Sequence, residues 1–169
     1  VWVRKICGND TSMTSDGITF ITAICDGAET FVNYDATMTA TTSTYSPIGY
    51  SFYNYGYTQT IIDSAFLAGM TNEIVAMSFE STVTTAGDEY QNMTVYLANV
   101  PEDNLSSGWI LPDSNHVFVK VIDSGDFRYT TTGQHLHGFD TSFAWDGHSN
   151  ILVAVVRDNG HYTSGATLD

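Results

Sequence analysis

The chain has 169 residues, of which 43% are hydrophobic and 13% aromatic. This length and composition suffice to bury one hydrophobic core, which excludes an intrinsically disordered or collagen-like protein. The 19 acidic residues outnumber the 5 Lys and Arg, giving a formal net charge of -14 at pH 7. Phosphate backbones and anionic bilayers are bound by clustered cations, so neither nucleic acid nor a membrane surface is expected as a partner. No apolar run approaches the ~20 residues of a membrane-spanning helix, and no membrane insertion is expected.

The first 26 residues predict a β-hairpin. Residues 1–7 and 18–24 are rich in β-branched and aromatic side chains, and the Gly, Asn, Asp and Ser between them favour turns. Cys7 and Cys25 stand at the outer ends of these strands. A disulfide between them would contribute ~3 kcal/mol in an oxidising compartment, whereas two unrelated buried thiols are the alternative.

The remainder predicts an all-β domain, because short strand-like segments alternate with Gly, Asp, Asn and Pro and no helical period is sustained. The segment 151–156 is apolar on both faces and is expected to be a central strand. One helical turn is predicted over residues 63–69, with Asp63 or Ser64 as its cap. The expected strands, in chain order, are residues 50–62, 73–80, 92–98, 117–122 and 151–156.

Two parts of the chain resemble known families. V-W-V-R-K-I-C-G-N-D-T-S followed by I-T-F-I-T-A-I-C resembles the last two strands of the cysteine-bearing fibronectin type III domains of Bacteroidota surface proteins. A second resemblance is to the jelly-roll repeats of cleaved adhesins and to carbohydrate-binding modules. It is carried by S-P-I-G-Y-S-F-Y-N-Y-G-Y-T-Q-T-I-I, E-I-V-A-M-S-F, M-T-V-Y-L-A-N, S-S-G-W-I-L-P and F-A-W-D-G-H-S-N-I-L-V-A-V-V-R-D-N-G.

These resemblances imply a partial fibronectin type III hairpin over residues 1–26 and a jelly-roll-like antiparallel β-sandwich over 27–169, cut before its last strands. They imply an extracellular or cell-surface address in a larger secreted bacterial protein, which agrees with the scarcity of Lys. The implied function is non-catalytic adhesion or glycan binding, with a glycan or a host cell-surface ligand as partner. The alternative is a self-assembling filament or surface-layer subunit that exchanges strands with other copies through open sheet edges.

Aromatic side chains are the candidate ligand contacts. Tyr53, Tyr55 and Tyr57 alternate along one expected strand and, if exposed, would form a platform on which sugar rings stack. Cross-strand packing is the competing interpretation. Trp109 in the turn-like S-S-G-W and Trp145 before Asp-Gly are either surface aromatics or packing anchors, and Trp109 is taken as the fourth candidate contact.

Two groups of residues are weaker candidates for metal binding. Asp123, Asp126, Asp146 and Asp158 lie in acidic turns and offer the oxygen ligands that Ca²⁺ prefers, although ordinary Asx turns explain them equally well. Structural calcium is the cofactor that these turns would bind. His135 and His137 share one face of a strand and could chelate a transition metal, but the alternation continues to Phe139, which favours a packing face.

No catalytic residue is predicted. The sequence contains no G-x-S-x-G, H-E-x-x-H, P-loop, G-x-G-x-x-G or C-x-x-C motif. The few Glu residues occupy loop or strand-edge contexts, where solvation explains them better than a pair of catalytic carboxylates. The expectation is a protein without enzyme activity.

Overall fold

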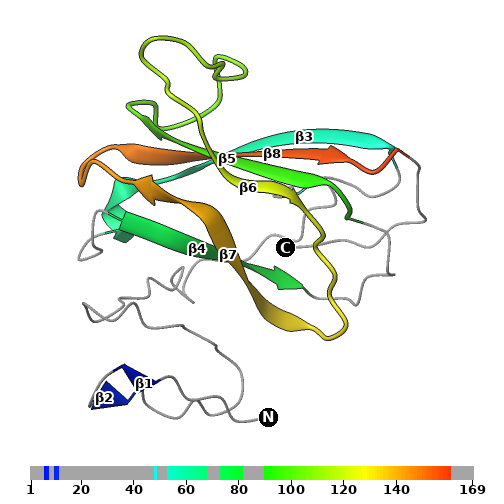
Figure 1. Ribbon diagram of the computed structural model, residues 1–169. Helices are drawn as coiled ribbons and strands as arrows, with labels where there is room; N and C mark the ends of the chain where they lie inside the picture. The colour runs from blue at the N-terminus through cyan, green and yellow to red at the C-terminus, as the bar shows by residue number, and fades with distance from the viewer. Residues whose placement is uncertain are drawn as a thin grey trace.

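The structure, a computed structural model, describes residues 6–7, 10–11, 48, 53–67, 73–81 and 90–160. Within these ranges the protein is an all-β sandwich with one short 3-10 helix, η1 (Ser64–Leu67), as the sequence predicted (Figure 1). The strands are β1 (Ile6–Cys7), β2 (Asp10–Thr11), β3 (Tyr55–Ile62), β4 (Glu73–Ser81), β5 (Met93–Val100), β6 (Val119–Gly125), β7 (Gly133–Ala144) and β8 (Asn150–Asp158).

Two antiparallel sheets make up the sandwich. The larger has the strand order β3-β8-β5-β6, and the smaller pairs β4 with β7. Strand β8 therefore lies between β3 and β5, where both of its faces are covered. Its residues from Ile151 to Val155 are at most 4% exposed, which confirms the central position predicted from an apolar run.

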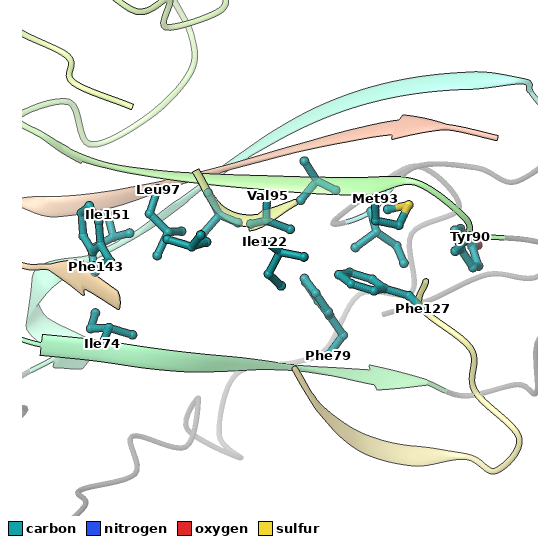
Figure 2. Close-up of a cluster of buried hydrophobic side chains, with 14 of the residues drawn as sticks. Ile74, Phe79, Tyr90, Met93, Val95, Leu97, Ile122, Phe127, Phe143 and Ile151 are labelled. Carbon is teal, nitrogen blue, oxygen red and sulfur yellow. The ribbon is translucent and has the colours of Figure 1, made fainter. Parts of the chain in front are cut away.

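The main core fills the space between the two sheets, as Figure 2 shows. Met93, Val95 and Leu97 alternate along β5 and are 0 to 3% exposed. They face the smaller sheet, from which Ile74 and Phe79 of β4 enter the same cluster. The period-2 pattern of β5 thus directs one apolar face inward.

A second cluster lies on the outer face of the larger sheet. Ala98, Val100 and Leu152 of this sheet are buried beneath Ile110, with Leu105 and Phe118 packed around them. Ile110 belongs to residues 101–118, which join β5 to β6 and are called here the covering loop. This loop folds back over the sheet because it carries its own apolar side chains.

Several predicted boundaries were wrong. Strand β3 begins at Tyr55, after a bend at Tyr53 and Asn54, and β6 begins at Val119. Val117 was predicted to begin this strand, but it belongs to the covering loop and is 66% exposed. The predicted helix cap is confirmed, because Asp63 Oδ1 accepts a hydrogen bond from the Ala65 amide at 2.8 Å.

At the N-terminus, β1 pairs with β2 through Ile6↔Thr11 and Cys7↔Asp10. Asp10 and Thr11 were predicted to lie in a turn. Only two residues separate the paired positions in the sequence, and a loop of two residues is enough to join antiparallel strands. The expected pairing of residues 1–7 with 18–24 lies outside the described residues, as does Cys25, so the hairpin domain and its disulfide stay predictions.

Candidate functional site

Four aromatic side chains are exposed on β3, on the bend before it and on the covering loop. Tyr53, Tyr55 and Tyr57 are 54%, 66% and 38% exposed, and Trp109 of the covering loop is 60% exposed. Within the described ranges these are the only aromatic residues in the exposed class. We call the four residues the aromatic platform. Trp109, which is far from the tyrosines in sequence, contacts Tyr57, and Tyr55 shares the strand face of Tyr57, whereas Tyr53 lies at the bend before the strand.

Tyr57 and Trp109 form the centre of the platform. Their ring centroids are 5.0 Å apart with an interplanar angle of 52°, so the two faces are tilted rather than stacked. Tyr57 is paired in register with Val156 of β8, which in turn is paired with Thr94 of β5. Partial burial raises the pKa of the Tyr57 hydroxyl, against a smaller lowering by its hydrogen bond with Gln59.

Gln59 fixes the covering loop to β3. Its Nε2 donates to the Ile110 carbonyl at 2.6 Å, and its Oε1 accepts from the Ile110 amide at 3.0 Å. The same Nε2 lies 2.7 Å from the Tyr57 hydroxyl. The side chain is only 8% exposed. Gln59 was not predicted as a site residue, although it continues the alternation of Tyr55 and Tyr57 with a polar side chain.

A glycine turn brings Trp109 to the surface. The Gly108 amide donates to the Leu105 carbonyl at 3.0 Å, and Gly108 has a φ of +106°. Residues that carry a Cβ rarely adopt a φ in this range, whereas glycine adopts it readily. The turn-like reading of S-S-G-W is therefore confirmed, and it places Trp109 one residue before the amide that Gln59 binds.

The four candidate calcium ligands do not form one site. Asp126 and Asp158 both lie near Asn92, whose amide donates to Asp126 Oδ1 at 3.4 Å and whose Nδ2 donates to the Asp158 carbonyl at 3.1 Å. Asp146 precedes the opposite end of β8, so the length of that strand, roughly 27 Å, separates it from Asp158.

Asp123 and Asp146 have local hydrogen-bond partners. Asp123 Oδ2 is 2.7 Å from Lys120 Nζ. Asp146 Oδ1 accepts from the amides of His148 and Ser149 at 2.9 and 2.7 Å, which is the Asx turn considered as the alternative. Across the described part of the chain, no three His, Cys, Asp or Glu residues are grouped so that they could hold a metal ion.

His135 and His137 of β7 face a group of aromatic rings. His137 Nε2 is 2.9 Å from the Tyr129 hydroxyl, and its ring centroid is 3.9 Å from that of Phe127. His135 Nε2 is 2.8 Å from the Thr131 carbonyl. Burial, and then the charge of His135, lower the pKa of His137 to about 4. These contacts agree with a packing face, as the alternation to Phe139 indicated.

The two tryptophans differ. Trp145 is 5% exposed, and its Nε1 donates to the Ser149 carbonyl at 2.8 Å, so it is a packing anchor, whereas Trp109 is a surface aromatic.

No helix in the described residues has the length and apolar character needed to cross a membrane. Comparisons of the sequence with protein-family models, with curated proteins and with solved structures found no match.

Proposed function

We propose that this domain binds carbohydrate, without catalysis, on the outer face of its larger sheet. The observation that carries the proposal is the aromatic platform, with exposed rings from β3, the bend before it and the covering loop, and with Tyr57 and Trp109 in contact at its centre. Aromatic faces stack against the C–H faces of sugar rings, and the tyrosine hydroxyls add hydrogen-bonding groups. A surface of this kind suits one side of an extended polysaccharide.

The support beneath the platform favours binding over incidental exposure. Gln59 holds the backbone of Ile110 through two hydrogen bonds, and the turn at Gly108 fixes the direction of the chain before Trp109. A ring held in position before the ligand arrives loses less conformational entropy on binding. The platform is therefore preorganised for a rigid partner.

Charge restricts the class of carbohydrate. The covering loop carries Glu102, Asp103 and Asp113 but no Lys or Arg, and exposed Asp158 is paired in register with Tyr55. Uronic acids and sulfated sugars would be repelled by these carboxylates. We therefore expect a neutral glycan.

The same proposal includes a role in adhesion or glycan attachment for a secreted bacterial surface protein. It also includes a jelly-roll topology for the sandwich. Its support is the resemblance of the strand segments to adhesin repeats and carbohydrate-binding modules. The competing prediction of a self-assembling subunit is tested by light scattering at high protein concentration. Polymers would favour strand exchange, and a monomer would contradict it.

The proposal is tested by glycan arrays followed by calorimetry with the strongest neutral oligosaccharide. Trp109→Ala and Tyr55→Ala are expected to weaken binding about tenfold or more, because each removes a stacking surface. Val117→Ala, an exposed side chain of the same loop, is the matched control and should change affinity less than about twofold. Arrays blank against plant, host and microbial polysaccharides would overturn the proposal, as would full affinity in Trp109→Ala.

A further inference from the structure

The two ends of the covering loop are joined by a single histidine. His116 Nε2 lies 3.0 Å from Glu102 Oε1. His116 Nδ1 lies 3.0 Å from Asp113 Oδ1. Glu102 directly follows the first residue of the loop and His116 stands near its end, so this contact closes the loop at its base.

The geometry requires a particular protonation state. A neutral imidazole has one N–H group and can donate to only one carboxylate, whereas the imidazolium ion has two. Because both ring nitrogens face carboxylate oxygens, the arrangement is complete only when His116 is charged. A neutral His116 would leave one carboxylate oxygen facing a lone pair.

The burial of His116 and the two carboxylates beside it act on its protonation in opposite directions. The His116 side chain is 16% exposed, and Glu102 Oε2 is buried without a hydrogen-bond partner in the described part of the chain. Burial alone lowers the pKa of His116, but the hydrogen bonds and charges of Glu102 and Asp113 together outweigh it and raise the pKa above 6.5.

Charged side chains near His116 in the sequence, on the covering loop and on β6, have other partners. Asp103, on the same arm of the loop as Glu102, accepts a hydrogen bond from Asn150 of β8 at 3.0 Å. Lys120 of β6 is paired with Asp123. The charged groups that contact His116 are thus Glu102 and Asp113.

In the sequence, Trp109 lies between two arms of the covering loop: a first arm with Glu102 and Asp103, and a second arm formed by residues 113–116. One arm is tied to β8, because Asn150 Nδ2 also donates to the Glu102 carbonyl at 3.0 Å. The middle of the loop is tied to β3 through Gln59 and Ile110. The second arm, residues 113–116, is joined to the first through the His116 ring.

We propose that protonated His116 is a clasp that keeps the covering loop closed and Trp109 in the aromatic platform, and that the loop loosens when His116 loses its proton. A raised pKa gives the sign of the effect: the clasp contributes fully below about pH 6.5 and is lost as pH rises through the folded-state value. The link to ligand binding rests on the proposed carbohydrate site, whereas the loosening of the loop does not.

The test is hydrogen exchange by mass spectrometry on the unliganded full chain between pH 5 and 9, corrected for intrinsic exchange rates. Protection of residues 101–118 should fall about three- to tenfold as His116 deprotonates. His116→Gln should show low protection at every pH. The control His148→Gln changes a 79% exposed imidazole beside Asp146 and should keep the wild-type pH dependence.

Two further measurements complete the test. The ring protons of His116 in NMR spectra should titrate above pH 6.5, with a midpoint that falls in Glu102→Gln. If a neutral glycan binds, its affinity should decrease at alkaline pH in the wild type and not in His116→Gln. Protection that is independent of pH, or unchanged in His116→Gln, would overturn the clasp even if the glycan binds. Blank arrays with pH-dependent protection would overturn the carbohydrate site and leave the clasp standing.

Discussion

His137 of β7 lies among aromatic rings, with Phe127 and Phe79 at 3.9 and 5.8 Å between centroids. Its Nε2 lies 2.9 Å from the Tyr129 hydroxyl. Its pKa falls from 6.5 in the unfolded chain to about 4, so the unfolded state binds more protons between these two pH values. The stability contributed by neutral His137 is complete above about pH 6.5 and decreases as pH falls toward 4.

We therefore expect the free energy of unfolding to drop by ~3 kcal/mol between pH 6.5 and 4 through this residue alone. His137→Phe should remove most of that slope because its ring fills the site without titrating. Urea unfolding at pH 7, 5.5 and 4.5 measures the effect, with His148→Gln as the control that keeps the slope. Parallel pH dependences in the wild type and His137→Phe would contradict this assignment.

At the scale of elements, the amide side chain of Gln59 hydrogen-bonds the covering loop to β3, beside the apolar cluster around Ile110 and the contact of Tyr57 with Trp109. Replacing Gln59 with Leu leaves the N–H and C=O of Ile110 without their buried partner, which should cost ~1–3 kcal/mol of stability. The loop should then be cut faster by chymotrypsin after Trp109. Thermal melts and timed digestion measure both effects. Thr141→Ala, at an exposed position of β7, should match the wild type in both assays. Equal digestion rates would show that the apolar cluster alone holds the loop.

The elements best predicted from sequence are those with a regular pattern. Strand β5 has apolar residues at alternate positions, and the segment 151–156 of β8 is apolar throughout. A strand that buries one face needs apolar residues at every second position, and one that buries both faces needs them at every position, so both patterns are visible in the sequence. Strand β7 was foreseen only around His135 to Phe139. Its far end, from Asp140 to Ala144, pairs with β4 through Ile74↔Phe143 across a register break, and that pairing has no local signature.

The candidate site was only partly predictable for a related reason. Tyr55 and Tyr57 share a face by simple alternation, which the sequence shows directly. Trp109 reaches Tyr57 through tertiary contacts of its loop, among them the hydrogen bond of Gln59 with Ile110, residues 51 positions apart. The contact from His116 to Glu102 likewise depends on how the loop folds back. Such tertiary contacts leave no periodic pattern, so individual candidates could be named but not their grouping.

For the whole molecule, the central position of β8 has a consequence outside the folded state. Residues 151–156 form a six-residue apolar run without a charge, rich in β-branched side chains, and Asn150 and Arg157 stand at its two ends. In the native sandwich both of its neighbouring strands protect it. In a heated chain the same run is free to pair with copies of itself, the pattern associated with cross-β aggregation.

Thermal denaturation is therefore expected to be irreversible at high protein concentration despite the large net negative charge. Val156→Thr introduces a hydroxyl into the run at a partly exposed position and should lower turbidity after heating and cooling. Val117→Thr makes the same change outside the run and should aggregate like the wild type. Equal turbidity in all three chains would place the aggregating segment elsewhere. If the prediction holds, β8 not only joins the larger sheet but also determines what fraction of the molecules refolds after heating.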